Sequence, residues 1–300
     1  MNLKDSIIKT IKYFDLFDFP LTAEEILEYL YEYDKPVHIK EIKGTLKEMV
    51  EAETIEEIKE HYILKGRRNI LETRKTRKFI AEKYWNRVKL YGIYMRDVPF
   101  VKMVGICNNL AYDNSSEQSD IDLFIVIKPG RMWIARFILT LVLHFYGVRR
   151  YKDKIAGRFC LSFFVTTNEL NMGKLQIKPE DPYLAYWTKL LCPIYGEETY
   201  EEFKTENEVW LKEQYGLNFS ERTKKHMYVN NKSKGKKFFE FLLKGKMGDY
   251  FEKLLKNTFK KRTLRKMKHL GPEASVIVSD DMLKFHNNDR RKEYLERWMK

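Results

Sequence analysis

The sequence is poor in cysteine, glycine and proline. Its 300 residues include 3 cysteines, 14 glycines and 8 prolines. The cysteines, Cys107, Cys160 and Cys192, are too few and too scattered for a disulfide framework, and no CxxC or Cys/His cluster indicates structural zinc. With 44% hydrophobic and 33% charged residues, this composition excludes a collagenous, low-complexity or wholly disordered chain.

Long apolar runs are also missing. The longest, Phe137–Val148, is too short for a bilayer, which takes about 20 residues, and it contains His144. The first 17 residues lack an apolar segment followed by a small-residue cleavage site, so we expect no signal peptide. We therefore expect a cytoplasmic protein with no membrane partner.

Acidic residues are fewer than basic ones, and the formal net charge is +13. Residues 221–270 hold 17 Lys and Arg against 4 Asp and Glu, so this stretch carries the whole surplus. Such a stretch predicts docking of a nucleic acid or another polyanion. The alternative is a solvated lysine face over a buried apolar stripe.

Residues 1–97 resemble a winged helix followed by a long connecting helix. The pattern predicts a first helix ending near Phe19-Pro20, a second opened by a Thr22/Glu25 capping box, and a third over 39–52. Two short alternating segments around residue 60 predict a hairpin, and a polar helix follows over 68–95. The third helix offers no Arg, Asn or Gln for base edges, which favours a packing role over nucleic-acid binding.

The remaining chain divides into two further regions. Within residues 98–180, the pattern predicts strands at 99–106, 121–127 and 158–165, with a buried helix over 131–150, as in an α/β core with a small mixed sheet. Residues 181–300 read as a helical, basic region with a last short strand at 275–280. The predicted fold class of the whole chain is α+β.

The most informative residues are Asp120 and Asp122, at the start of the second predicted strand. Alternate side chains of a strand share a face, so the two carboxylates project together. Two carboxylates on an otherwise apolar strand are costly without a cation or hydrogen-bond donors. Mg²⁺ prefers one or two carboxylates together with phosphate oxygens, so the pair is a candidate metal site.

In this region the chain resembles the polymerase-β-type nucleotidyltransferase superfamily. The family signature is a strand ending in Gly-Ser or Gly-Gly, a helical spacer, then Asp-x-Asp on the next strand, and VKMVGICNNLAYDNSSEQSDIDLFIV has that form. The resemblance implies Asp120 and Asp122 as catalytic metal ligands for Mg²⁺ or Mn²⁺. It implies transfer of a nucleoside monophosphate from an NTP to a hydroxyl, with Asn108, Asn109, Ser119 and Arg131 contacting the nucleotide.

Two departures from the family pattern leave alternatives open. Asn108-Asn109 stands in place of the glycine turn, where asparagine tolerates a left-handed φ. Active members carry a third carboxylate on a later strand, but the central polar residue of the matching strand is Ser162, and Asp153 and Glu169 lie outside it. The chain could therefore be a catalytically inactive fold serving as a nucleic-acid-binding or regulatory module.

Two further choices remain open. A glycosyltransferase that binds a sugar nucleotide through its DxD pair ranks last, because it needs a larger region ahead of Asp120. Arg149 and Arg150, at the end of the predicted buried helix, suit either the helix dipole or a substrate phosphate.

Overall fold

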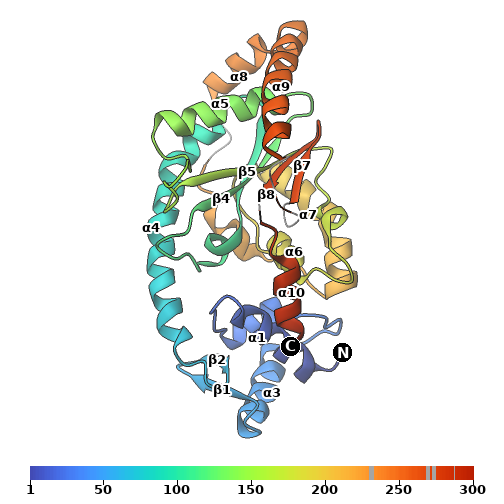
Figure 1. Ribbon diagram of the computed structural model, residues 1–300. Coiled ribbons are helices and arrows are strands. Elements are labelled where there is room, and N and C mark those ends of the chain that lie inside the picture. Colours follow the sequence, from blue (N-terminus) through green and yellow to red (C-terminus); the bar gives the residue numbers. More distant parts are fainter. Residues whose placement is uncertain (230–232, 268–270, 272–274, 287) are drawn as a thin grey trace.

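The computed structural model describes residues 1–229, 233–267, 271, 275–286 and 288–300, and its fold is mixed α+β, as predicted. The chain begins with three helices and a hairpin, followed by the long helix α4 (Figure 1). The predicted capping box forms, because the Thr22 hydroxyl accepts from the Glu25 N–H and the Glu25 carboxylate accepts from the Thr22 N–H. These elements are α1 Leu3–Asp15, α2 Ala23–Tyr29, α3 Ile39–Glu51, β1 Ile55–Ile58, β2 His61–Leu64 and α4 Ile70–Arg96.

A six-stranded sheet in the order β6-β3-β4-β5-β8-β7 forms the centre of the described structure. Strands β4 and β5 are parallel and the other neighbours are antiparallel. The strands are β3 Val101–Ile106, β4 Ile121–Ile127, β5 Phe159–Thr166, β6 Cys192–Tyr195, β7 Ser275–Val278 and β8 Met282–His286. The predicted strand near 275 is confirmed, and the region 181–300 contributes three strands in addition to its helices.

Helices and short 3₁₀ segments cover the two faces of this sheet. Helices α4 and α5 pack on one face, and α6 and α7 pack on the other together with the first helices of the chain. The remaining elements are η1 Asn108–Tyr112, α5 Met132–Phe145, η2 Met172–Leu175, α6 Pro182–Lys189, α7 Glu197–Tyr215, η3 Glu221–His226, α8 Lys234–Leu242, α9 Gly245–Met267 and α10 Arg291–Met299.

Strand β4 is buried on both faces because helices pack on both sides of the sheet at its centre. Leu123 and Ile125 belong to the core under α4 and α5, whereas Phe124 and Val126 belong to the core that includes α6 and α7. This alternation explains the continuous apolar run of the sequence. Asp122 shares the parity of Phe124, so it faces the α6 side of the sheet.

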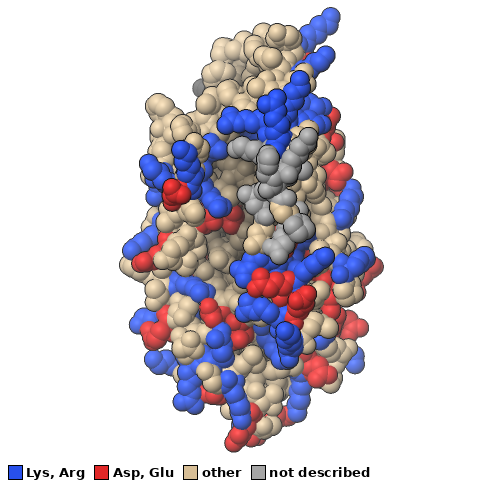
Figure 2. Space-filling model, in the orientation of Figure 1, with Lys and Arg blue, Asp and Glu red and all other residues tan. Residues whose placement is uncertain are grey.

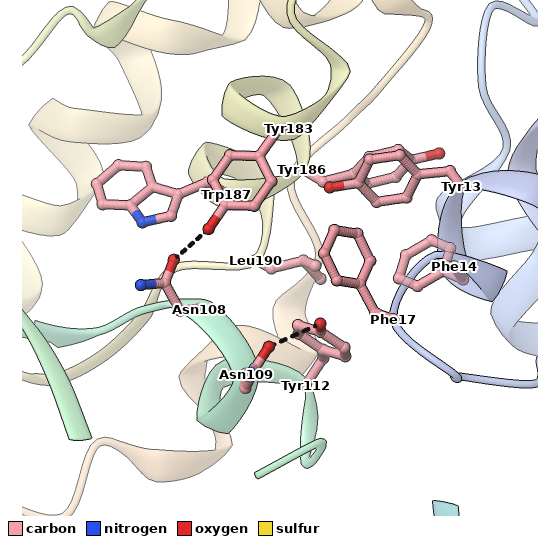
Figure 3. Close-up of a pocket in the computed structure, with 10 residues that line it drawn as sticks. All are labelled: Tyr13, Phe14, Phe17, Asn108, Asn109, Tyr112, Tyr183, Tyr186, Trp187 and Leu190. Atoms are coloured by element: carbon pink, nitrogen blue, oxygen red, sulfur yellow. Dashed lines mark hydrogen bonds between the residues drawn. The ribbon is translucent and has the colours of Figure 1, made fainter. Parts of the chain in front are cut away.

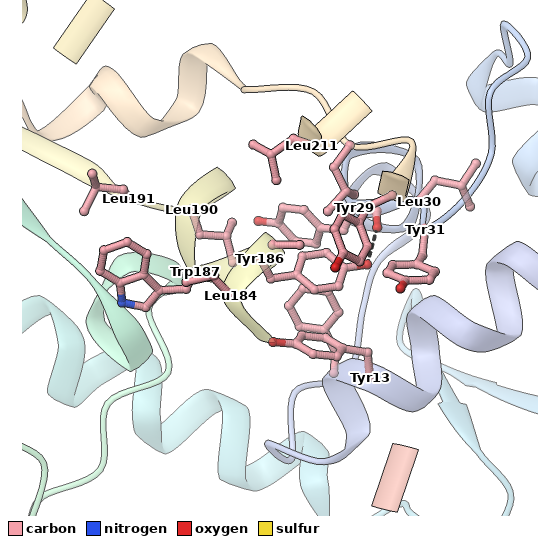
Figure 4. Packing of buried hydrophobic residues seen from close by; sticks show 14 of the residues in the cluster. Tyr13, Tyr29, Leu30, Tyr31, Leu184, Tyr186, Trp187, Leu190, Leu191 and Leu211 are labelled. Carbon is pink, nitrogen blue, oxygen red and sulfur yellow. Dashed lines mark hydrogen bonds between the residues drawn. The ribbon is translucent and has the colours of Figure 1, made fainter. Parts of the chain in front are cut away.

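The second core joins the first helices of the chain to much later ones. Tyr13 of α1 stacks on Tyr186 of α6 with ring centroids 4.2 Å apart, and the Tyr186 hydroxyl donates to the Tyr29 carbonyl at 2.7 Å (Figure 4). The Trp298 indole of α10 donates to the Lys9 carbonyl at 2.9 Å, so the two chain ends lie close together (Figure 1). One continuous set of buried side chains therefore links the start and the end of the chain.

Helices α8 and α9 extend from the end of the molecule opposite the chain termini (Figure 1). α9 packs against α5, where the rings of Phe259 and Phe137 lie 5.7 Å apart. In the described part of the chain, none of the helices combines the length and apolar character needed to cross a bilayer.

Candidate metal and nucleotide site

Asp120 and Asp122 lie at the start of the central strand β4, as the sequence predicts. Their side chains meet Cys160 of the neighbouring strand β5, and the ligand atoms of the three residues lie within 4.8 Å of one another. Cys160 stands beside Asp122 because the parallel register of β4 and β5 pairs these two residues. The cluster therefore presents two carboxylates and one thiol on the α6 side of the sheet.

Cys160 occupies the place at which the family resemblance implies a third carboxylate. The sequence directed attention to Ser162, but a shift in register after Asp122 pairs Phe124 with Phe163, and Cys160 is the residue whose sulfur joins the cluster. Glu169 instead bonds Lys174, and Asp113 bonds Lys225. Among the described residues, no third carboxylate belongs to this cluster.

Each carboxylate is held by a partner from another element. Arg150, in the segment between α5 and β5, places its guanidinium 2.7 Å from Asp120 Oδ2 and 3.6 Å from Cys160 Sγ. The Asn108 amide donates to Asp122 Oδ2 at 2.7 Å. The sequence left the helix dipole or a substrate phosphate as the partner of Arg150, but α5 ends at Phe145, so Arg150 lies beyond the helix and pairs with Asp120.

Burial and mutual repulsion set the protonation of the cluster. Burial and, next, the charge of Asp120 raise the pKa of Asp122 to about 6, and the Asn108 hydrogen bond acts in the opposite direction. Burial and the two carboxylates raise the pKa of the Cys160 thiol to about 12. At neutral pH the Asp122 carboxylate is therefore mostly ionised and the Cys160 thiol is neutral, and the guanidinium of Arg150 bonds Asp120. A divalent cation would stabilise carboxylates held this close together.

Asn108 and Asn109 open η1, directly after β3. Asn108 has a φ of 57°, the left-handed conformation that asparagine tolerates. The side-chain oxygen Oδ1 of Asn108 accepts from the Tyr183 hydroxyl at 3.0 Å, and Oδ1 of Asn109 accepts from the Tyr112 hydroxyl at 3.1 Å (Figure 3). Asn108 thus connects the carboxylate cluster to α6, whereas the Asn109 side chain turns toward a small cavity lined by aromatic side chains.

Ser119 and Arg131 have structural partners away from the cluster. The Ser119 hydroxyl accepts from the Ser116 N–H at 3.0 Å and so closes the loop before Asp120. Arg131 follows the other end of β4, a strand of 7 residues, and at about 3.3 Å per residue it lies roughly 20 Å from the carboxylates. It pairs with Asp249 of α9 at 2.8 Å. The structure therefore does not bring Arg131 to the site, where the resemblance implies a contact with the nucleotide, and Arg131 pairs with the carboxylate of Asp249 instead.

A second cavity, of about 590 Å³, adjoins the cluster through Asn108. Its wall includes Tyr183 and Trp187 of α6, and two cations, Lys284 of β8 and Arg291 of α10. Burial lowers the pKa of Lys284 to about 8, and Arg291 bonds Asp181 at 2.6 Å. Lys284 is a buried part of this wall, because it is only 4% exposed. Asp280 and Asp281 point elsewhere, because they bond Lys256 and Thr166.

Comparison with known proteins identifies no related protein. The chain matches neither a protein-family model, nor a curated protein, nor a solved structure. The interpretation of the site therefore rests on its own geometry.

Proposed function

We propose that this protein is a divergent nucleotidyltransferase-like protein that binds an NTP with Mg²⁺ at Asp120 and Asp122. The observation that carries the proposal is the juxtaposition of three parts: a strand, a turn that opens with Asn108, and a central strand whose Asp122 accepts a hydrogen bond from that asparagine. These are the parts that the family resemblance names, in the same order along the chain. Residues 98–180 are accordingly assigned as a nucleotidyltransferase-like core.

The proposed reaction is transfer of a nucleoside monophosphate. The acceptor hydroxyl oxygen forms a bond to the α-phosphorus, the bond to the β-phosphate bridging oxygen breaks, the hydroxyl proton passes to solvent and pyrophosphate leaves. Mg²⁺ would neutralise the triphosphate and orient the attacking oxygen. Asp120 and Asp122 would hold the cation, Asn108 keeps Asp122 in place, and Arg150 is near enough to contact a phosphate once Asp120 binds the cation.

A second candidate is nucleotide binding without turnover, and Cys160 favours it. Its thiol stays protonated at neutral pH, so the place of the third carboxylate holds neither a charged ligand nor a base. This candidate shares the binding step with the first, and only an assay of transfer separates them.

The first experiment measures NTP binding by calorimetry with and without Mg²⁺. We expect binding of at least one NTP by the wild type and its loss in the Asp120→Asn/Asp122→Asn variant. Asp280→Asn, an exposed aspartate bonded to Lys256, is the matched control and should bind like the wild type. Failure of the wild type to bind any NTP would contradict both candidates.

The second experiment follows release of pyrophosphate and incorporation of α-labelled nucleotide. The Cys160→Asp variant places a carboxylate beside Asp122, and Cys160→Ser is its uncharged control. We expect Cys160→Asp to bind Mg²⁺ more tightly than Cys160→Ser. Turnover by the wild type supports the transferase, whereas turnover confined to Cys160→Asp supports binding alone.

We assign residues 1–97 as a winged-helix-like unit with a packing role. The exposed side of α3 carries lysines bonded to glutamates, as in the pairs Lys43–Glu24 and Lys47–Glu51. Its apolar side, with Ile42 and Leu46 fully buried, enters the core shared with α6 and α10. A face of paired charges neither attracts phosphates nor reads base edges. Unchanged nucleic-acid affinity after Lys43→Glu/Lys47→Glu would agree with this role.

A further inference from the structure

Helix α8 buries the charged side chain of Lys236 and leaves its phenylalanines exposed. Lys236 is 9% exposed, and its ammonium donates to the Val101 carbonyl and, at 3.0 Å, to the Tyr195 hydroxyl. By contrast, Phe238 and Phe241 are 59% and 74% exposed. A helix that only covers a sheet has the opposite orientation, so this arrangement calls for a partner on its outer side.

The exposed apolar surface continues onto α9. We name it the apolar tip, because both helices extend from one end of the molecule (Figure 1). Its large side chains are all between 39% and 74% exposed. They are Phe238, Phe239, Phe241, Leu242, Met247, Tyr250, Phe251 and Leu254.

Basic side chains flank the apolar tip. Lys237, Lys246 and Lys253 are exposed on the same two helices, and Lys244 is exposed in the turn between them. In the space-filling view the upper end of the molecule is mostly uncharged, with Lys and Arg side chains gathered along one flank (Figure 2). A cleft adjoins Phe241, and its wall carries one acidic residue, Glu240, and five basic ones: Lys102, Lys128, Arg131, Lys237 and Lys244. A cationic cleft and an apolar surface thus meet at α8.

We propose that the apolar tip docks on the surface of an anionic phospholipid bilayer. Aromatic and aliphatic side chains on a basic helix are the pattern of segments that lie in the membrane interface. The phenylalanines would enter the boundary between head groups and acyl chains, and the basic cleft would take lipid phosphates. Such surface binding needs no spanning helix, and it does not depend on the proposed nucleotide site.

Other partners fit these observations less well. Two copies of the chain would bring together surfaces that both carry the lysine surplus, and these surfaces would repel each other. A single-stranded nucleic acid stacks on aromatic rings, but Leu242, Met247 and Leu254 offer no ring for a base. An anionic lipid surface accepts the aliphatic side chains, the rings and the lysines together.

The test is co-sedimentation of the purified chain with vesicles of phosphatidylcholine alone or mixed with phosphatidylglycerol. We expect binding to the anionic vesicles, weakening as salt rises, and little binding to the neutral ones. The Phe238→Ser/Phe241→Ser variant should bind on the order of 10- to 100-fold more weakly. Lys244→Glu/Lys246→Glu should lower affinity for the anionic vesicles by roughly 10-fold or more.

A matched control separates docking from general loss of apolar surface. Phe79 on α4 is 59% exposed, like Phe238, but it lies outside the apolar tip, so Phe79→Ser should bind as the wild type does. Equal binding by the phenylalanine variant and the wild type would overturn the proposal. Two other results would also overturn it. One is a wild-type dimer in light scattering that the phenylalanine variant no longer forms, and the other is binding to poly(U) without binding to vesicles.

Discussion

Side chains at the two ends of the central sheet differ in whether they have partners within the chain. At the start of β4, Asp120 bonds Arg150, Asp122 bonds Asn108, and Asn108 bonds Tyr183. At the far end, α8 leaves Phe238 and Phe241 largely in solvent. A ligand at the first end must replace hydrogen bonds that the carboxylates already make within the chain. A partner at the second end only has to cover the exposed phenylalanines. Substitutions should therefore affect stability strongly at the first end and weakly at the second.

The largest effect is expected from Arg291→Met beside the second cavity. Arg291 bonds Asp181 at 2.6 Å with 10% and 1% of the two side chains exposed, so the change leaves a buried carboxylate without its partner. We expect a loss of about 3–5 kcal/mol in the free energy of unfolding, measured with urea. Lys256→Met, which breaks the exposed pair with Asp280, should cost about 1 kcal/mol or less. Equal losses of unfolding free energy in the two variants would contradict the expected difference between the buried and the exposed ion pair.

The next effect is a gain in stability from Asp122→Asn. The pKa of Asp122 is about 6 in the folded chain, above its ordinary value of 3.8, so the native state binds more protons than the unfolded state between these values. The stability that this protonation contributes is complete below about pH 4 and is lost as the pH rises through about 6. We expect Asp122→Asn to be more stable than the wild type by about 2–3 kcal/mol at pH 7 and about equally stable at pH 4. A constant difference between these pH values would count against the shifted pKa.

A smaller effect is expected from Tyr183→Phe, which removes the hydroxyl that bonds Asn108 at 3.0 Å. The loss of one partly buried hydrogen bond should cost about 1 kcal/mol of unfolding free energy. Because Asn108 also bonds Asp122, we expect the affinity for NTP to change together with the free energy of unfolding. Calorimetry can measure this affinity. Tyr250→Phe, at a tyrosine that is 66% exposed, should change neither quantity.

The smallest effect on stability is expected at the apolar tip. Phe241→Ser replaces a side chain that is 74% exposed and should change the free energy of unfolding by no more than about 0.5 kcal/mol. Phe203→Ala, at a fully buried phenylalanine of α7, should cost about 3–5 kcal/mol in the same urea measurement. A large loss with Phe241→Ser would show that this ring packs within the fold and would weaken the proposed docking surface.

Local patterns in the sequence predict the strands of the site and its two carboxylates. The apolar run of β4 and the alternation of side chains on a strand place Asp120 and Asp122 on one face without any knowledge of the rest of the chain. The left-handed conformation of Asn108 is likewise a local preference, and the structure confirms it. These features depend on neighbours within a few positions.

The rest of the site depends on pairings between distant segments. Cys160 joins the cluster through the register of β4 and β5, and Lys284 reaches the adjoining cavity because β8 pairs with β5. Strand β6 escaped prediction because its 4 residues contain Pro193, a residue that edge strands tolerate and that sequence patterns treat as a break. Neither register nor strand order can be read from one short segment.

The hydrogen bond from Trp298 to Lys9 has a consequence for the order of synthesis. It joins residues 289 positions apart, and it belongs to the core that buries α1. A ribosome adds about 5–20 residues per second, so the first helix waits roughly 15 to 60 s for the last one. During that interval the apolar side of α1 lacks part of its covering. The burial of α1 is therefore complete only after α10 has been synthesised.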